Sequence, residues 1–443
     1  MGGTDEGPDR RRHGTESQRG VNTPVQFWQA PERPEWLARI IDECRYMDPA
    51  AIVPLDAQNL IATAMQRTGL ADFGSDDWRE PFDILTRSLD NEAELHLFGR
   101  IMTRNELINL LEVRLRVEET YRLHPEIEDE VIDAPVFITG LGRSGTSILF
   151  ELLSQDGQFG VPSSWEAMFP CPPPEAATYR SDPRADVAHQ LLTQWGRAAP
   201  PWQAMHESGG WIPAECVAVY EASFRSDNMP SKAPAGEYAA WLASADMKPA
   251  LQYYARLLKL LQWRNPRKHW LLKSPSHLSY LPTLFDVFPD ARVIVTHRDP
   301  IKANASITNM LATLFWMRST KPFNVSEFEA LMTPDGVAAR LNRLIDWIDA
   351  GDVPASRISA SLYADLINDP EQAVATLYKR VGLTLDDKAS EAVRSYIAHK
   401  PRHKFGVHTY DTGTEADIIR QRDLFRRYQD RFAVPDEIVA HAG

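Results

Sequence analysis

Apolar and polar positions divide the chain into a helical first part and a second part in which two periodicities alternate. In residues 34–122, apolar side chains recur every three or four positions, for example at Leu37, Ile40, Ile41 and Cys44. This spacing matches the period of the α-helix and gives each helix one apolar face. We therefore expect mostly helices in this part of the chain.

From residue 134 onward, short apolar runs end at loops and are followed by helical spacing. The stretch 134–153 predicts a buried strand, a glycine-rich loop and a helix, and further strands are expected at 269–273, 291–297 and 357–363. Strands and helices that alternate in this way form right-handed βαβ units. The predicted fold class is therefore α/β, with a parallel sheet flanked by helices and an N-terminal helical region.

Changes in composition indicate where the segments of the chain begin and end. Residues 1–24 are rich in glycine and charge and predict a disordered tail, and residues 25–133 form the helical N-terminal region. The α/β domain then spans 134–443 and includes a helical insertion at about 184–263. A proline-rich segment precedes the insertion, and its prolines exclude regular structure. We expect this loop to form a wall of a pocket.

Net charge and cysteine content limit the classes of function. The 443 residues carry a formal net charge of −13, which argues against nucleic acid as a partner because that binding depends on neutralising phosphates. The three cysteines lack C-x-x-C spacing, which predicts a reducing, cytoplasmic compartment. No apolar run approaches the ~20 residues that span a bilayer, so no membrane span is expected.

The glycine-rich loop has the form of a P-loop without its lysine. Gly140, Gly145 and Ser147 lie where G-x-x-x-x-G-K-[ST] has its two glycines and its hydroxyl, but Thr146 replaces the lysine. That lysine reaches the β- and γ-phosphates of a nucleoside triphosphate. Arg143 instead provides a cation inside the loop, beside N–H groups at a helix start. This P-loop-like arrangement suits a smaller anionic group than a triphosphate.

The pattern G-x-G-R-S-G-T-S resembles the 5′-phosphosulfate loop of sulfotransferases that use 3′-phosphoadenosine 5′-phosphosulfate (PAPS) as donor. The resemblance covers about residues 134–432 and is closest to bacterial sulfotransferases, which often carry an N-terminal helical region and a Trp-Glu pair before a proline-rich loop. It implies that the 5′-phosphosulfate is bound by six residues of the loop: Gly142, Arg143, Ser144, Gly145, Thr146 and Ser147.

A second anion site is expected after the strand at 291–297. Arg298 follows that strand directly, and Ser306 lies eight residues further along. A guanidinium fork and a hydroxyl suit a terminal phosphate, and the resemblance implies that they bind the 3′-phosphate of PAPS. The alternative is that Arg298 only pairs with Asp299 or Asp365 at the sheet edge.

The resemblance implies two further donor contacts. Tyr363 corresponds to a family tyrosine near the adenine, and Lys404 belongs to a loosened version of the family's phosphate loop, in which Phe405 interrupts the match.

For catalysis, the resemblance implies that Lys273 at a strand end stabilises the leaving phosphate oxygen, together with Arg143. Two residues are candidates for the base that activates the acceptor hydroxyl. Glu166 lies close to the position of the catalytic glutamate in protein-tyrosine sulfotransferases, whereas His277 lies near the histidine of the cytosolic small-molecule enzymes, at a shifted spacing. We favour Glu166. His206 and Glu215 flank a Gly-Gly-Trp turn and are expected to line the acceptor pocket.

The resemblance therefore implies a sulfotransferase that moves a sulfuryl group from PAPS to a hydroxyl and leaves 3′-phosphoadenosine 5′-phosphate (PAP), without a metal. Tryptophans and tyrosines between 200 and 260 favour a small-molecule or lipid-like, apolar acceptor. A homo-oligomer is left open. The alternatives are a P-loop kinase or other nucleotide-dependent phosphotransferase, and a non-catalytic nucleotide-binding module.

Overall fold

The computed structural model describes residues 28–324, 332–399 and 414–438. The predicted tail at 1–24 and the predicted donor residue Lys404 lie outside these residues.

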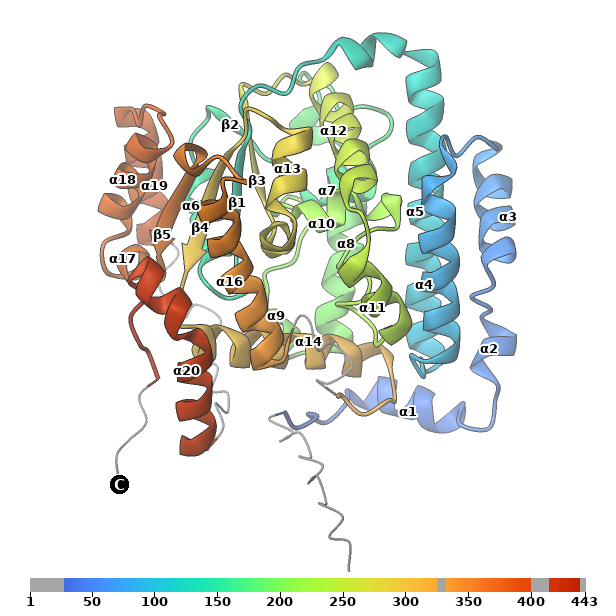
Figure 1. The fold of residues 1–443 in the computed structure, drawn as a ribbon. Helices are drawn as coiled ribbons and strands as arrows, with labels where there is room; N and C mark the ends of the chain where they lie inside the picture. Colours follow the sequence, from blue (N-terminus) through green and yellow to red (C-terminus); the bar gives the residue numbers. More distant parts are fainter. Residues whose placement is uncertain (1–27, 325–331, 400–413, 439–443) are drawn as a thin grey trace, which may run out of the picture.

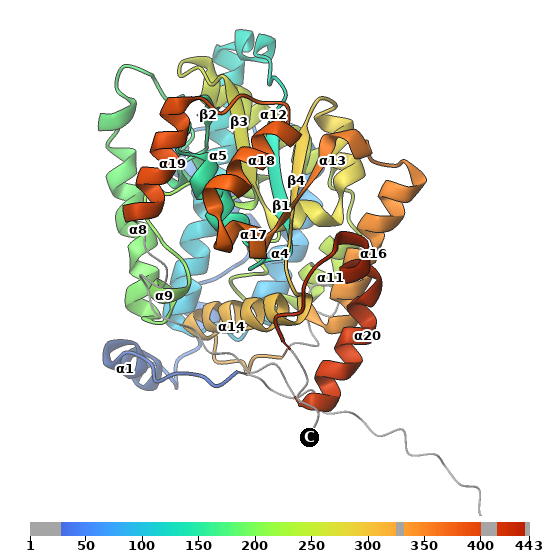
Figure 2. The ribbon, with the colours of Figure 1, turned by 90° about the vertical axis from the view of Figure 1, so that its left-hand side faces the viewer.

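Five parallel strands form the centre of the fold, in the order β2-β3-β1-β4-β5. Figure 2 shows β2, β3, β1 and β4 of this sheet. The strands are β1 (Val136–Gly140), β2 (Phe159–Gly160), β3 (His269–Lys273), β4 (Arg292–His297) and β5 (Ile358–Leu362). In the sheet, Ile138 of β1 pairs with Lys273 on one side and with Ile294 on the other. The carboxyl ends of β1, β3 and β4 therefore meet at one edge, where ligands of open α/β sheets bind.

Side chains alternate between the two faces of the central strand. Val136 and Ile138 of β1 belong to one hydrophobic cluster, and Phe137 between them belongs to another. On the face of Ile138 the cluster includes residues of α6 (Thr146–Leu153), α17 (Tyr363–Asn368), α18 (Pro370–Arg380) and α19 (Asp387–His399). On the face of Phe137 it includes residues of α12 (Lys248–Trp263), α13 (Leu281–Val287) and α16 (Pro334–Ala350). The result is a three-layer arrangement of helices, sheet and helices (Figure 1).

The N-terminal helices lie on the side of α12 that faces away from the sheet (Figure 1). They are α1 (Glu35–Glu43), α2 (Pro49–Ile52), α3 (Ala57–Thr68), α4 (Arg79–Asn91) and α5 (Leu97–Leu123). Buried residues of α3, α4 and α5, such as Leu60, Phe82 and Leu111, belong to the same hydrophobic cluster as Phe137 of the sheet. The helical region and the α/β domain therefore share one continuous core.

Five α-helices lie between β2 and α12 along the chain. These are α7 (Ser164–Met168), α8 (Arg184–Ala198), α9 (Trp202–Met205), α10 (Cys216–Val219) and α11 (Gly236–Ser244). Two more helices, α14 (Pro300–Arg318) and α20 (Glu415–Phe432), cross the lower end of the molecule in the view of Figure 1.

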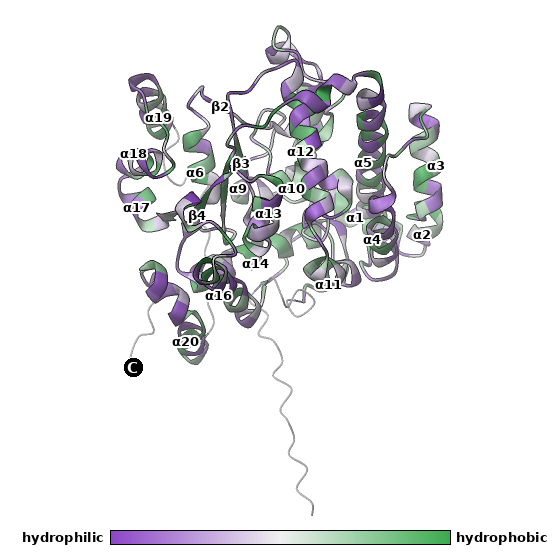
Figure 3. Cartoon of the chain, turned by 45° about the horizontal axis from the view of Figure 1, so that its top comes forward, coloured by the Kyte–Doolittle hydropathy of each residue, from purple (hydrophilic) through white to green (hydrophobic). Residues whose placement is uncertain are grey.

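The hydropathy of the helices agrees with these positions. Figure 3 shows polar and apolar residues mixed along the outer helices, as expected for helices with one face toward the core. Among the residues that the structure describes, no helix is both long and apolar enough to cross a membrane.

The sheet confirms the fold class predicted from the sequence. The strand expected at 269–273 coincides with β3, and those expected at 291–297 and 357–363 differ from β4 and β5 by one residue at the ends. The sequence missed β2, which has only two residues, too few to show a period.

Candidate active site

The loop between β1 and α6 curves closely against the end of β4. Gly140 and Gly145 have φ angles of 143° and 99°, in the region that favours glycine. A Cβ atom on Gly140 would lie 2.4 Å from the Thr296 carbonyl oxygen, and one on Gly145 would lie 2.9 Å from the Tyr363 ring. The buried Ser144 hydroxyl bonds the Leu141 carbonyl and the Thr296 hydroxyl, each at 2.6 Å. Ser144 thus fixes the loop to the sheet.

Arg143 lies at the tip of this loop and connects it to two other segments. Its φ angle of 67° is unusual for a residue with a side chain. Its Nε donates to the Ser306 hydroxyl of α14 at 3.1 Å, and its Nη1 donates to the Met205 carbonyl at 3.3 Å. The loop, α14 and the end of α9 therefore converge on one guanidinium.

Arg298 follows β4 and lies beside the same loop. Its Nη1 donates to the Arg143 carbonyl at 2.9 Å, and the guanidinium carbon lies 3.9 Å from the centre of the Tyr363 ring. Its Nε and Nη2 donate to the Glu437 carboxylate at 2.7 and 2.8 Å. Arg298 therefore pairs with a carboxylate near the end of the described chain, and not with Asp299 or Asp365.

The sequence-predicted anion-binding residues thus come together through Arg143. Ser306 contacts Arg143, while Arg298 holds the carbonyl of that same residue. Two guanidinium groups, a hydroxyl and the start of α6 lie around the carboxyl ends of β1 and β4, an arrangement suited to phosphate groups.

Lys273 is the last residue of β3, and only 3% of its surface is exposed. Its Nζ donates to the Ser147 hydroxyl at 3.2 Å and forms an ion pair with Glu215, the residue before α10. A cation held against the P-loop-like helix start is suited to stabilise negative charge that develops there.

A cavity of about 710 Å³ opens beside the loop, and Gly142, Arg143, Thr146 and Ser147 line one end of it. Helices α5, α8 and α14 supply apolar walls, which include Met102, Leu192, Trp195, Ile307, Leu311 and Leu314. This size and lining are typical of pockets that bind small organic molecules.

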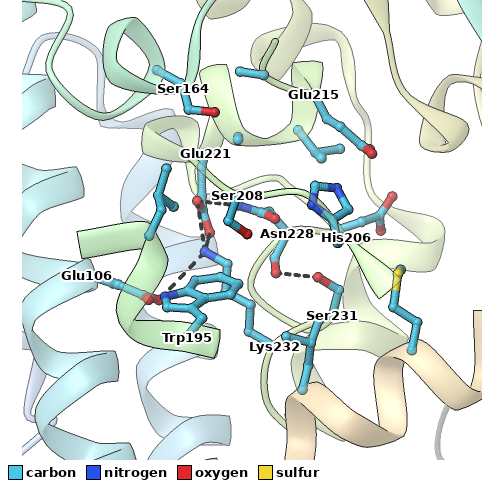
Figure 4. Close-up of a pocket in the computed structure, with 18 of the residues that line it drawn as sticks. Glu106, Ser164, Trp195, His206, Ser208, Glu215, Glu221, Asn228, Ser231 and Lys232 are labelled. Carbon is cyan, nitrogen blue, oxygen red and sulfur yellow. Dashed lines mark hydrogen bonds and ion pairs between the residues drawn. The ribbon is translucent and has the colours of Figure 1, made fainter. Parts of the chain in front are cut away.

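His206 and Glu215 both line this cavity, as the sequence predicts, and Figure 4 shows them in its wall. The His206 ring stacks on Trp202, with centroids 5.1 Å apart, and its Nδ1 lies 2.8 Å from the Glu207 carbonyl oxygen. A carbonyl oxygen can only accept, so Nδ1 carries the proton and Nε2 is left with a lone pair.

Burial lowers the pKa of His206 below 6.5. The charges of Lys273 and Arg143 also lower the pKa of His206. The Glu215 carboxylate and the hydrogen bond to the Glu207 carbonyl act in the opposite direction and raise it. The net lowering favours a neutral imidazole at neutral pH, which can accept a proton.

A charged network forms another part of the cavity wall (Figure 4). Lys232 donates to Glu221 at 3.0 Å and lies 3.6 Å from Glu106, which also accepts from Arg318 at 2.7 and 2.9 Å. Burial raises the pKa of Glu106, but Arg318 and Lys232 outweigh it and lower the pKa overall. The network joins α5 to the end of α14 through the pair of Glu106 and Arg318.

Comparison with known proteins assigns the chain to a family. Residues 135–387 match the model of the sulfotransferase family. This chain belongs to that family. A curated relative, the omega-hydroxy-beta-dihydromenaquinone-9 sulfotransferase Stf3 of Mycobacterium bovis, is 26% identical over 295 residues, which are 62% of this chain and 70% of the relative.

Two solved sulfotransferase structures share the fold. Sulfotransferase STF1 from Mycobacterium tuberculosis is 29% identical, with a TM-score of 0.71 over 85% of this chain and 98% of its own. Sulfotransferase STF9 from Mycobacterium avium is 27% identical, with a TM-score of 0.73 over 86% of this chain and 98% of its own. The chain is therefore a transferase of the bacterial sulfotransferase type.

The structure of this sulfotransferase argues against Glu166 as the base. Glu166 is completely buried and forms the capping box of α7 with Ser163. Its carboxylate accepts from the Ser163 N–H and hydroxyl at 2.8 Å, from Tyr179 at 2.9 Å and from Arg267 at 2.9 Å. It does not line the cavity. These contacts favour a structural role for Glu166 over the predicted role of base.

The position of His277 also argues against its predicted role as the base. It lies in a 3₁₀ turn after β3, is completely buried, and its ring packs edge-on against Phe137 and Tyr280. Burial lowers its pKa to about 3. Neither ring nitrogen has a hydrogen-bond partner among the described residues, and the side chain does not line the cavity. His277 is part of the core.

Among the described residues, no three histidine, cysteine or acidic side chains gather as a metal site. The ion pair between Lys273 and Glu215 and the one between Arg298 and Glu437 escaped the sequence reasoning. The partners of these pairs lie 58 and 139 residues apart, so no local sequence motif contains both members of either pair.

Proposed function

We propose that this sulfotransferase moves a sulfuryl group from PAPS to a hydroxyl of an apolar small-molecule or lipid-like acceptor and releases PAP. The proposal rests on one observation: two anion-binding elements, the P-loop-like loop and Arg298, lie together with the Lys273 cation beside an apolar cavity. The loop with Arg143, the arginine Arg298 and the lysine Lys273 all lie at the carboxyl ends of neighbouring strands.

The residues present fit an anionic nucleotide. Arg298 already holds the Glu437 carboxylate through two parallel N–H bonds, the geometry that a phosphate group also uses. In this proposal Arg298 and Ser306 bind the 3′-phosphate. Residues 142–147, which include Arg143, bind the 5′-phosphosulfate. Tyr363, whose ring stacks on Arg298, forms a wall on the adenosine side.

His206 is proposed as the base in place of Glu166 and His277. Its Nε2 takes the proton from the acceptor hydroxyl while the acceptor oxygen forms a bond to sulfur. The bond between sulfur and the bridging oxygen breaks, and the electron pair stays on the 5′-phosphate of PAP. Lys273 and Arg143 stabilise the charge that develops on this oxygen. Glu215 positions Lys273 through their ion pair.

The walls of the cavity support an apolar acceptor. Helices α5, α8 and α14 provide mainly apolar side chains beside the loop. The name of the mycobacterial relative specifies a hydroxylated menaquinone as its substrate, and an acceptor of this class would fill a cavity of about 710 Å³ better than a sugar would.

Turnover assays test this function. The purified protein is incubated with PAPS and with either hydroxylated menaquinone analogues and long-chain alcohols or hydrophilic sugars, and PAP release is measured. We expect PAP release that depends on the apolar alcohols. Release with sugars alone would contradict the acceptor class, and phosphoryl transfer from Mg-ATP to any of these acceptors would contradict the donor.

A further inference from the structure

The segment 436–438 lies against the arginine that the proposed function assigns to the donor. The Glu437 carboxylate receives two N–H bonds from Arg298, at 2.7 and 2.8 Å. The side chains of Arg298 and Glu437 are 11% and 31% exposed, so the pair is shielded from water more than a surface ion pair. An internal carboxylate therefore occupies the anion-binding edge of this guanidinium.

The main chain of the segment is held separately from the Glu437 side chain. The buried Asp299 carboxylate accepts the N–H groups of Glu437 and Ile438 at 2.7 and 3.0 Å. Arg422 of α20 donates to the same carboxylate at 3.1 and 3.0 Å, and to the Ile438 carbonyl at 2.6 Å. The Glu437 side chain can therefore leave Arg298 without release of the backbone.

The guanidinium itself is fixed in orientation. The Tyr363 ring lies 3.9 Å from its central carbon, and Nη1 is bonded to the Arg143 carbonyl. The edge formed by Nε and Nη2 is the one that faces Glu437. Because a guanidinium edge of this kind binds one carboxylate or one phosphate through two parallel bonds, the two anions compete for it.

We propose that Glu437 is an affinity-setting residue of the donor site, a tethered carboxylate that competes with the 3′-phosphate of the nucleotide for Arg298. The inference rests on the proposed function. A nucleotide with a 3′-phosphate must displace Glu437, whereas a nucleotide without this group leaves the ion pair intact. When PAP dissociates, Glu437 returns to Arg298, and this return favours release of the product.

Calorimetric titration of the full chain tests the proposal, with PAP and with adenosine 5′-phosphosulfate, which lacks the 3′-phosphate. The variants are Glu437→Ala and the isosteric Glu437→Gln. Asp436→Asn is the matched control. Asp436 pairs with Arg422 at 2.9 Å, so this substitution removes a neighbouring negative charge and leaves the pair of Arg298 and Glu437 in place. We expect both Glu437 variants to lower the Kd of PAP about tenfold, the scale of one charged hydrogen-bonded contact. The Kd of adenosine 5′-phosphosulfate is expected to stay unchanged.

The outcomes separate this inference from the proposed function. Equal, measurable PAP binding by the wild type and both Glu437 variants would overturn the inference and leave the function standing. An equal gain in Asp436→Asn, or an equal gain for both nucleotides, would also overturn it, because either result would indicate a general charge effect. If neither the wild type nor the variants bind PAP, the proposed function fails as well.

Discussion

The proposed donor side of the active site consists of short loops at the ends of β1, β3 and β4, whereas the proposed acceptor side is a cavity lined by α5, α8 and α14. On the donor side, Arg143, Lys273 and Arg298 are each tied to backbone or side-chain partners that fix their direction. On the acceptor side, most of the wall is apolar. Directional contacts select a nucleotide by its charged groups, while an apolar wall selects by volume and shape.

The two sides also differ in how much a single residue matters. Each donor-side cation has its own partner, and the loss of one removes a specific charge from the reaction. The acceptor wall shares its contacts among many side chains, so the loss of one changes the fit only in part. Substitutions on the two sides should therefore affect different kinetic constants.

Loss of the proposed base should have the largest effect. His206→Ala is expected to lower kcat by about 10²–10⁴-fold, the usual contribution of a general base. Because burial lowers the pKa of His206 below 6.5, wild-type activity should fall only on the acid side of neutrality, where the imidazole becomes protonated. The variant should lose this acid limb of the pH profile.

His189→Ala is the matched control, because His189 on α8 is exposed and does not line the cavity. Full activity of His206→Ala together with a large loss in Glu215→Gln would transfer the role of base to Glu215.

Removal of the Lys273 charge should have the next largest effect. Lys273→Met is expected to lower kcat by about 10²–10³-fold, as for the loss of one preorganised oxyanion donor. Steady-state kinetics at saturating PAPS would measure it, with the exposed Lys248→Met of α12 as control. A kcat close to that of the wild type would show that the Lys273 charge plays no part in the transfer.

A bulky residue in the cavity should affect only the acceptor. Leu311 of α14 lines the cavity, and Leu311→Trp is expected to raise the KM of an apolar acceptor about tenfold, because pockets discriminate by volume. The Kd of PAP should not change. Leu123→Trp, at a residue that is 55% exposed at the end of α5, is the control. An unchanged KM in Leu311→Trp would place the acceptor elsewhere.

Loss of the buried glutamate should affect stability and leave the chemistry intact. Glu166→Ala removes one partner of the ion pair with Arg267, at 2.9 Å, and is expected to lower the free energy of unfolding by about 3 kcal/mol. Denaturant unfolding would measure this loss, and kcat of the folded variant should match the wild type. A loss of kcat in a fully folded sample would restore Glu166 as the base.

The sequence predicted the arrangement of the proposed donor side better than that of the proposed acceptor side, because the residues of the former lie in local patterns at strand ends. Gly140 ends β1, Arg143 and Gly145 follow it in the adjoining loop, and Arg298 directly follows β4. The acceptor side brings together α5, α8 and α14, which are far apart in the chain and carry no motif. The positions of these three helices relative to one another depend on how the helices pack, and the sequence pattern does not specify that packing.

The positions of Glu166 and His277 away from the cavity have local causes. Ser163-x-x-Glu166 is itself a capping-box pattern, so the sequence contained a structural explanation for the glutamate. His277 follows Lys273 by four residues, but the 3₁₀ turn directs its ring into the core. Both residues follow proposed catalytic residues along the chain, but the backbone directs their side chains away from the cavity.

The most direct test of the account is calorimetric titration of the wild-type protein and Arg298→Ala with PAP, ADP and Mg-ATP. Arg426→Ala, at an exposed arginine of α20, serves as control. We expect PAP to bind the wild type and the control more tightly than ADP or Mg-ATP does, and we expect Arg298→Ala to lose this preference. Equal or tighter binding of Mg-ATP by the wild type would contradict a donor site built for a 3′-phosphate.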